Sequence, residues 1–274
     1  MERARKQAMS KGVVLFAFNS EKYDYFKMAV ATAKRVNHFL NLPVTLISDK
    51  DSVQETKNIF DKIHIVEPDK NNRRDWGQWI NKGRYQAYEL SPYDDTILLD
   101  TDYMINSNKL LTLFDFDTDF CCHGRTEFFM QPKLPQERLS AYSYDTLWAT
   151  VVRFKKSTYS QQIFECLEMV QKNYMHYSML HGFNPGVYRN DYALSIATRI
   201  VNGQFLPKSS IIPWSLYHVG KNTSIYRNND SEFNTEYTVM YDNWQRGKIR
   251  KEYMYIDNMD FHVMIKENFM ELIA

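Results

Sequence analysis

Short apolar runs in the first hundred residues constrain most strongly how this chain folds. Val13 to Phe18 is an unbroken run, and three shorter, mostly apolar stretches are expected strands at Val44 to Ile47, Ile63 to Val66 and Thr96 to Leu99. An unbroken apolar run is typical of a strand that is buried on both faces of a sheet. The first run ends in Asn19 and Ser20, and the second in Ser48 and Asp49. Polar residues therefore follow the expected strands, where α/β folds bind their ligands.

Helical patterns separate these runs. Between the first two, apolar residues recur at helical spacing from Asp24 to Leu40 and form one buried stripe. Lys82 to Leu90 reads as a second helix, which Ser91-Pro92 ends. Alternation of strand and helix at this spacing predicts a doubly wound α/β fold, with a Rossmann-like, mostly parallel sheet flanked by helices.

The second half of the chain has a less regular pattern. Arg125 to Asp145 is expected to form a long loop over the ligand site at the ends of the expected strands. After it we expect a strand, two helices and a late strand at Leu147 to Phe154, Ser160 to Asn173, Asp191 to Val201 and Tyr253 to Ile256. The pattern predicts a flexible extension over residues 1–11 and one domain over residues 12–274. This domain has two halves, residues 12–124 and 125–274, and the second half has the irregular pattern of elements.

The composition excludes several classes of protein. Lys and Arg number 34 against 33 Asp and Glu, a formal net charge of +1, so no global charge attracts a polyanion or an anionic membrane. The three cysteines, Cys121, Cys122 and Cys166, lack the spacing of a disulfide framework or a zinc site. No run approaches the roughly 20 apolar residues of a membrane span, and residues 1–11 lack the apolar centre of a signal peptide. We expect a cytoplasmic protein without a membrane span.

Two carboxylates two residues apart give the sharpest chemical signal. Asp100 and Asp102, with Thr101 between them, directly follow the apolar strand that ends at Leu99. Like charges at a strand end are costly unless a cation or hydrogen-bond donors compensate them, and a divalent metal that also binds a diphosphate is a suitable partner. The alternative is a turn-forming aspartate pair, because Asp-x-Asp also occurs by chance.

The Asp-x-Asp arrangement resembles the GT-A superfamily of glycosyltransferases, whose motif holds manganese or magnesium on the diphosphate of a nucleotide sugar. Upstream, Lys82 to Asp94 is similar to the glycogenin-like pattern of family eight, which has a basic helix before the strand. That resemblance implies that Lys82 and Arg84 reach the donor sugar and its phosphates. A solvated helix face is the alternative for both.

The resemblance implies further ligands late in the chain. Asp260 to Lys266 is similar to the late His and Lys of family eight, so His262 would complete the metal shell and Lys266 would neutralise diphosphate. The family's usual glycine, proline and tryptophan around this lysine are missing here. His218 competes with His262, and each can instead be a structural histidine.

Acceptor and nucleoside contacts are also implied. The segment Asn184 to Asp191 resembles the "Asn-x-Gly" segment and nearby acid of related transferases, which makes Asn184, Gly186 and Asp191 catalytic candidates. Asp191 alternatively serves as an ordinary residue of the first helical turn. Ala17, Phe18, Asn19 and Asp49 would meet the nucleoside, because they follow the first two strands.

Nearly the whole chain after Met9 resembles uncharacterised glycosyltransferase-like proteins of tailed, T-even-like marine phages, including the segments Asp75 to Trp79, Lys82 to Tyr103 and Tyr188 to Gly203. The likeness implies a phage-encoded enzyme in an infected bacterium. Within Asp75 to Trp79, the side chains of Trp76 and Trp79 are candidates to wall the site.

We therefore expect a metal-dependent enzyme that moves a sugar from a nucleoside diphosphate sugar to an acceptor hydroxyl. One alternative acts on hydroxymethylated pyrimidines in phage DNA, for which Arg73-Arg74 and Arg246 to Lys251 supply basic patches. A nucleotidyltransferase is less well matched, because the residues after the first strand contain no phosphate-binding glycine. A non-catalytic sugar-binding or virion-associated module is the alternative from another class. The sequence does not identify the acceptor, the donor or the oligomeric state.

Overall fold

The computed structural model describes residues 9–56, 58–67, 81–131, 136–220, 222–245 and 248–274. A seven-stranded sheet runs through its centre in the order β3-β2-β1-β4-β8-β6-β9. These strands are β3 (Lys62–Ile65), β2 (Val44–Ser48), β1 (Lys11–Phe16), β4 (Asp95–Leu99), β8 (Trp148–Lys155), β6 (Phe120–His123) and β9 (Ile211–Ile212). Strands β3, β2, β1 and β4 are parallel, β8 runs antiparallel to both of its neighbours, and β9 is parallel to β6. The expected mostly parallel α/β sheet is confirmed.

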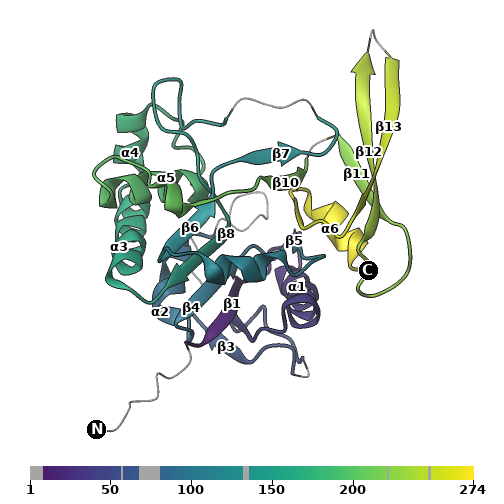
Figure 1. The fold of residues 1–274 in the computed structure, drawn as a ribbon, viewed down its shortest axis with the longest axis horizontal. Helices are drawn as coiled ribbons and strands as arrows, with labels where there is room; N and C mark the ends of the chain where they lie inside the picture. The colour runs from purple at the N-terminus through teal and green to yellow at the C-terminus, as the bar shows by residue number, and fades with distance from the viewer. Residues whose placement is uncertain (1–8, 57, 68–80, 132–135, 221, 246–247) are drawn as a thin grey trace.

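Helices cover both faces of this sheet (Figure 1). Val13 and Leu15 of β1 pack in one core with α1 (Tyr25–Leu40), while Val14 and Phe16 pack in a second core with α3 (Thr158–Lys172) and α5 (Asn190–Val201). Successive residues of a strand point to opposite faces, so an unbroken apolar run is what a sheet covered on both sides requires. None of the helices in the described ranges is long and apolar enough to cross a bilayer.

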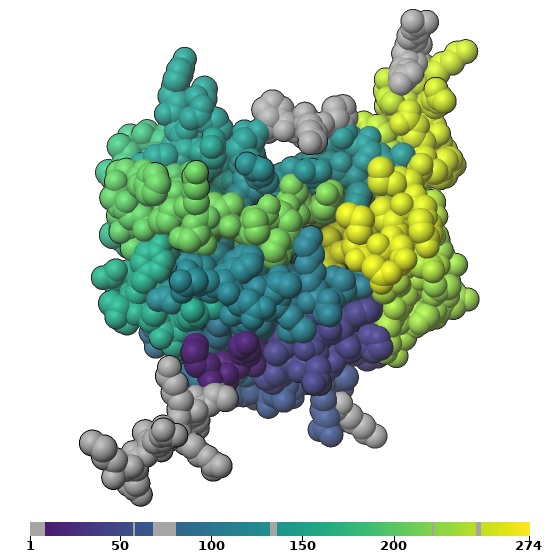
Figure 2. Space-filling model, viewed as in Figure 1, coloured from purple at the N-terminus to yellow at the C-terminus, as the bar shows by residue number. Residues whose placement is uncertain are grey.

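Two smaller sheets extend the fold on the side of the carboxyl ends. The first has the order β5-β14-β10-β7 and the second the order β11-β12-β13. Their strands are β5 (Tyr103–Met104), β14 (Phe261–Val263), β10 (Leu216–Val219), β7 (Thr126–Phe128), β11 (Thr223–Arg227), β12 (Glu236–Gln245) and β13 (Lys248–Asp257). The hairpin of β12 and β13 projects from the body of the molecule (Figure 2).

Several elements differ from the sequence expectations. The expected helix Lys82 to Leu90 is a 3₁₀ helix, η2 (Lys82–Gln86), followed by the short α2 (Ala87–Leu90). The expected loop Arg125 to Asp145 contains β7, which pairs with β10 about ninety residues later, so no local pattern revealed it. The expected strand Tyr253 to Ile256 is the end of the longer β13.

Other elements were not anticipated. They are the helices α4 (Tyr174–His181) and α6 (Lys266–Leu272), the short 3₁₀ helices η3 (Lys109–Asp115) and η4 (Lys208–Ser210), and the strands β5, β6, β9, β10, β11, β12 and β14. At the amino end, β1 already begins at Lys11, and the hydroxyl of Ser10 donates to Asp94 at 2.8 Å.

His123 on β6 is expected to make the stability of the fold depend on pH. Burial lowers the pKa of this imidazole to about 4, and its Nδ1 lies 3.1 Å from the carbonyl oxygen of Trp214. The unfolded chain, with an ordinary histidine pKa near 6.5, binds this proton more readily, so the contribution to stability is complete above about pH 6.5 and is lost as pH falls towards 4. When the pH falls from 7 to 5, the free energy of unfolding should drop by about 2 kcal/mol more in the wild type than in His123→Phe.

Urea denaturation at the two pH values measures this difference, and the pH-independent cost of the substitution cancels in it. His176→Gln, at an exposed position of α4, controls for the loss of a histidine. An unchanged pH dependence in His123→Phe would contradict the assignment.

Candidate active site

The turn after β4 presents both aspartates of the Asp-x-Asp sequence. The backbone N–H of Asp100 donates to the carbonyl of Thr150 on β8 at 3.0 Å. The carbonyl of Asp102 accepts from the N–H of Val263 on β14 at 3.0 Å. On α1, the hydroxyl of Thr32 donates to the carbonyl of Thr101 at 2.8 Å. The turn is thus fixed from three sides, and the side chains of Asp100 and Asp102 are held in place by the backbone.

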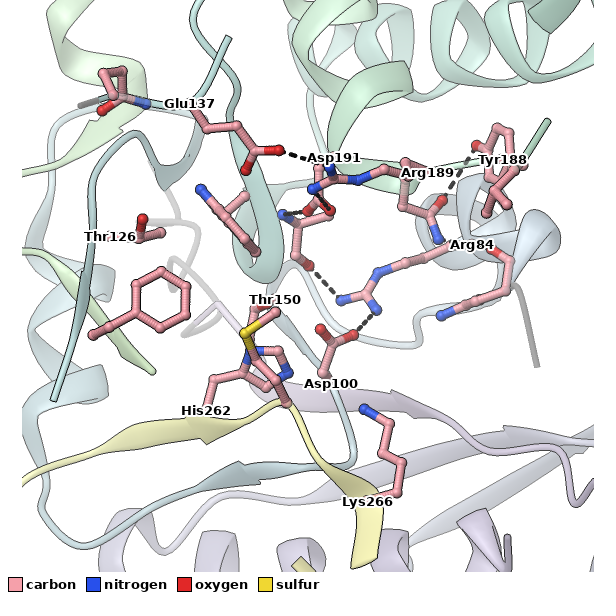
Figure 3. Close-up of a pocket in the computed structure, with 18 residues that line it drawn as sticks. Arg84, Asp100, Thr126, Glu137, Thr150, Tyr188, Arg189, Asp191, His262 and Lys266 are labelled. Carbon is pink, nitrogen blue, oxygen red and sulfur yellow. Dashed lines mark hydrogen bonds and ion pairs between the residues drawn. The ribbon is translucent and has the colours of Figure 1, made fainter. Parts of the chain in front are cut away.

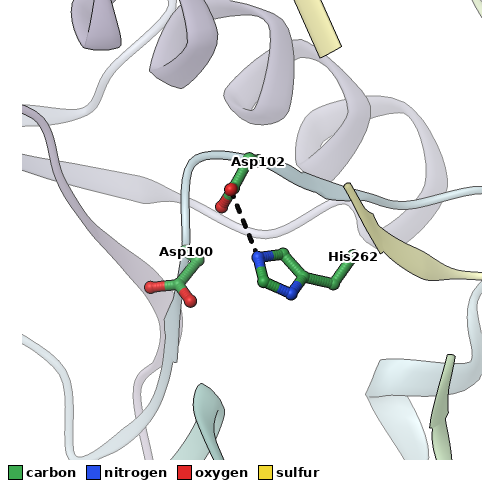
Figure 4. Close-up of side chains that lie close together, drawn as sticks. All are labelled: Asp100, Asp102 and His262. Carbon is green, nitrogen blue, oxygen red and sulfur yellow. Dashed lines mark hydrogen bonds and ion pairs between the residues drawn. The ribbon is translucent and has the colours of Figure 1, made fainter. Parts of the chain in front are cut away.

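His262 faces this turn because β14 pairs with β5, which places His262 opposite Tyr103. Its Nε2 lies 3.2 Å from Oδ2 of Asp102, and the imidazole is directed at that carboxylate (Figure 4). One ligand atom from each of Asp100, Asp102 and His262 lies within 4.8 Å of the others. Ligands of a divalent ion at about 2.1 Å lie about 3 to 4 Å apart. Small side-chain movements would bring the three atoms into one coordination sphere, and the oxygen and nitrogen donors suit manganese or magnesium.

Two cationic side chains neutralise the aspartates. The ammonium of Lys266 contacts Oδ2 of Asp102, and the guanidinium of Arg84 pairs with Oδ1 of Asp100. Burial disfavours the charge of Asp102, but Lys266 and His262 outweigh it and hold the pKa of this carboxyl well below its usual range. Asp102 is therefore ionised at neutral pH.

The Asp100 carboxylate opens onto a cavity of about 810 Å³. Small-molecule sites in proteins have volumes of about 300 to 1,000 Å³. Figure 3 shows His262 and Lys266 at one end of the cavity, Asp100 and Arg84 in the middle, and Asp191 with Arg189 and Glu137 at the other end. The cavity thus brings a candidate metal site, three cationic side chains and two further acidic groups to one space.

Arg189 connects the acidic groups at the far end. Its guanidinium donates to Glu137 at 2.7 Å and to Asp191 at 3.4 Å. The other oxygen of Asp191 accepts from the N–H of Ala149 at 2.9 Å. Burial raises the pKa of Asp191, although the neighbouring Arg189 opposes this shift. A carboxyl with a raised pKa in a cavity is a candidate for proton transfer.

The sequence candidates divide into two groups by position. Five of them line the cavity, namely Arg84, Asp100, Asp191, His262 and Lys266, and Asp102 contacts two of these residues. Eight are not among the lining residues, namely Ala17, Phe18, Asn19, Asp49, Lys82, Thr101, Asn184 and Gly186. Trp76 and Trp79 lie outside the described residues.

Polar groups outside the cavity make local hydrogen bonds. The side-chain oxygen of Asn19 accepts from the N–H of Phe26 at 2.9 Å, near the start of α1. Asp49 accepts from the N–H of Ser52 at 2.8 Å, which closes a turn after β2. The amide oxygen of Asn184 accepts from the N–H of Gly186 at 2.8 Å. These groups shape the loops at the carboxyl ends of the strands and beside α5.

Several cavity residues were missed by sequence reasoning. Glu137 lies in a segment without periodicity, so nothing local singled it out. Trp148, at the start of β8, looked like an ordinary apolar strand residue. Arg189 stands two residues before Asp191, and its charge beside an acidic candidate was the one available signal.

His218, the competing histidine, lies behind His262. Strand β10 pairs with β14 so that the two histidines are opposite each other, and their Nδ1 atoms are 3.0 Å apart. His218 is fully buried, and burial lowers its pKa well below the usual value. It does not line the cavity. The metal-site candidate is therefore His262, with His218 in contact behind it.

Fold and site together define an α/β protein with a ligand-sized cavity at the carboxyl ends of a mostly parallel sheet and a carboxylate-histidine cluster on its wall. No protein-family model and no curated protein sequence matches the chain.

Similar solved structures are glycosyltransferases. The galactosyltransferase LgtC, in complex with donor and acceptor sugar analogues, is 13% identical over 67% of this chain and 69% of its own, with a TM-score of 0.47. The glycosyltransferase GlyE of Streptococcus pneumoniae TIGR4 is 12% identical over 72% of this chain, with a TM-score of 0.42. This chain spans 44% of the length of GlyE.

Proposed function

We propose that this protein is a metal-dependent glycosyltransferase that moves a sugar from a nucleoside diphosphate sugar to an acceptor hydroxyl. One observation carries the proposal: Asp100, Asp102 and His262 offer ligand atoms within 4.8 Å of one another beside a cavity of about 810 Å³. The resemblance of the Asp-x-Asp and His-Lys segments to GT-A enzymes of family eight supports the same assignment.

Asp100, Asp102 and His262 would hold Mn²⁺ or Mg²⁺. Bound there, the ion supplies Lewis-acid stabilisation of the charge that develops on the departing diphosphate. Lys266 and Arg84, both at the same wall, add positive charge for this leaving group. Lys266 and Arg84 contact the aspartates in this structure, so a bound ion would replace them at the carboxylates and leave their charges for the diphosphate.

Asp191 would act at the reacting sugar. It lies at the other end of the cavity from Lys266, and its raised pKa suits proton exchange with an acceptor hydroxyl. Arg189 would keep the carboxylate oriented through its bonds to Asp191 and Glu137. We place Asn184 and Gly186 in the acceptor-side loop that leads into α5.

Nucleoside contacts are proposed at the ends of β1 and β2. Ala17 to Asn19 follow β1 and Asp49 follows β2, and adjacent parallel strands deliver these residues to one edge of the sheet. Lys82, which begins η2 next to the cavity residue Asn81, is proposed to reach the phosphates.

A donor panel tests the function. The full chain is incubated with Mn²⁺ and one nucleoside diphosphate sugar at a time, and both thermal stability and nucleoside diphosphate release are measured. We expect one donor to raise the melting temperature only with metal present, since a ligand that binds the folded state stabilises it by mass action. If no donor does so, a non-catalytic binding module is favoured.

The substitution Asp191→Asn separates transfer from donor binding. It keeps the oxygen that accepts from Ala149 but removes the proton-accepting charge. Transfer should fall about 100-fold or more, as for the loss of a general acid-base group, while the donor-induced thermal shift is retained. A variant that loses the thermal shift as well would assign Asp191 to donor binding instead.

Hydroxymethylated DNA is a second candidate acceptor. Lys248, Arg250 and Lys251 are exposed on β13, in the projecting hairpin. Adding unmodified and hydroxymethylated duplexes to the donor assay at two salt concentrations tests it, because DNA binding through these cations would weaken steeply with salt.

A further inference from the structure

We propose that His218 is a positioning residue for His262: its Nδ1 accepts the Nδ1–H of His262 and so leaves Nε2 of His262 free for a divalent cation. This inference rests on the proposed metal site, and it concerns a residue that neither lines the cavity nor reaches the aspartates.

The geometry comes from the register of two strands. His218 and His262 are paired residues of the parallel strands β10 and β14. Their Nδ1 atoms are 3.0 Å apart, and their rings meet edge-on with centroids separated by 5.0 Å. The opposite nitrogen of His262, Nε2, is 3.2 Å from Asp102. His262 therefore has one nitrogen on His218 and one at the carboxylate cluster.

The shared proton links the tautomers of the two rings. A neutral imidazole carries one N–H, and two Nδ1 atoms at hydrogen-bond distance share a single proton. When His262 carries this proton on Nδ1, its Nε2 is a lone pair that can bind a metal ion. When His218 carries it, the proton of His262 is on Nε2 and points at Asp102, so that nitrogen has no lone pair for a metal ion. Cation binding therefore selects the first arrangement.

A histidine at position 218 suits this change of tautomer better than a group that can only accept a hydrogen bond. Because imidazole nitrogens both donate and accept, the pair serves the metal-free and the metal-bound state with the same total number of protons. Its own Nε2 is buried and has no hydrogen-bond partner among the described residues, so either tautomer leaves that atom equally unpaired. A backbone carbonyl in the place of His218 would support the metal-bound state alone.

Packing fixes the orientation of the His218 ring. The side chain is fully buried, with its centroid 4.7 Å from that of Trp148 and 5.1 Å from that of Phe128. Both of these neighbours line the cavity. This packing holds the plane of the ring, and the contact with Nδ1 of His262 determines which edge of the ring faces that residue.

The test measures Mn²⁺ affinity in the full chain without donor, by isothermal titration and by the spin-resonance signal of free Mn²⁺. His218→Phe keeps an aromatic ring between Trp148 and Phe128 but removes the acceptor. We expect it to weaken Mn²⁺ binding about 10- to 100-fold, as for other partners of metal-ligating histidines. His218→Asn places an amide near the position of Nδ1 and should bind within about threefold of wild type.

Controls separate this proposal from the metal site itself. His176→Gln removes an exposed histidine of α4 that does not line the cavity and should leave Mn²⁺ affinity unchanged. Should His218→Phe not fold, His218→Gln, whose amide reaches the Nε2 position, takes its place with the same expected loss. Wild-type affinity in His218→Phe or His218→Gln, together with a loss in His262→Ala, would overturn the role of His218. Unchanged affinity in His262→Ala would instead overturn the proposed metal site.

Discussion

Replacing Asp102 by asparagine is expected to lower Mn²⁺-dependent transfer about 1,000-fold. The carboxylate is buried and contacts both Lys266 and His262, so it is the centre of the proposed site. A metal ion contributes several kcal/mol of charge stabilisation in the transition state, and about 4 kcal/mol corresponds to this factor. Asparagine has nearly the same shape, so the loss reports the missing charge.

The same substitution leaves the ammonium of Lys266 without its counter-charge, so the folded fraction must be established first. Circular dichroism and thermal denaturation set an assay temperature at which the variant is native. Asp94→Asn, on an exposed carboxylate just before the same strand, is the matched control and should keep full activity. If Asp102→Asn transfers sugar at a rate close to that of Asp94→Asn, the metal site lies elsewhere.

Replacing Arg153 by methionine is expected to destabilise the fold by about 3 to 5 kcal/mol. Arg153 is fully buried on β8, and its Nε and Nη2 each donate to a carboxylate oxygen of Asp95 on β4 at 2.7 Å. Its Nη1 also donates to the carbonyl of Thr118. Removing the guanidinium leaves a buried carboxylate without a partner, which is the costly case for an ion pair.

Urea denaturation of two further variants completes this test. The double variant Arg153→Met/Asp95→Leu should be more stable than Arg153→Met, because removal of both partners leaves no buried charge. Lys172→Met breaks the exposed pair with Glu168 and should cost less than about 1 kcal/mol. Equal costs for Arg153→Met and Lys172→Met would contradict the argument.

Local sequence patterns predicted the elements that carry the first half of the site. The four expected strands lie on β1, β2, β3 and β4, and α1 follows the expected stripe. Burial on both faces holds for β1, β2 and β4, whereas β3 is an exposed edge strand. Each of these patterns involves residues only a few positions apart, so it can be recognised in a single sequence without knowledge of the tertiary structure. The position of Asp100 and Asp102 at the end of a buried strand follows from the same kind of pattern.

Cross-strand pairing decided the rest of the site. His262 faces Asp102 because β14 pairs with β5, although the two residues are 160 positions apart. Glu137 reaches Arg189 from a segment that had no pattern at all. The contact between His218 and His262 depends on the register of β10 and β14, which a shift of one residue would abolish.

By itself, the sequence determined a doubly wound α/β sheet and the strand end where two carboxylates emerge. The reason is that a strand buried on both faces needs consecutive apolar residues, which are visible in the sequence. Tertiary structure alone decided which distant side chains meet these carboxylates. Strand pairing joins residues irrespective of their separation along the chain, and its hydrogen bonds belong to the backbone, which carries the same groups at nearly every residue and so does not mark the partner strand in the sequence.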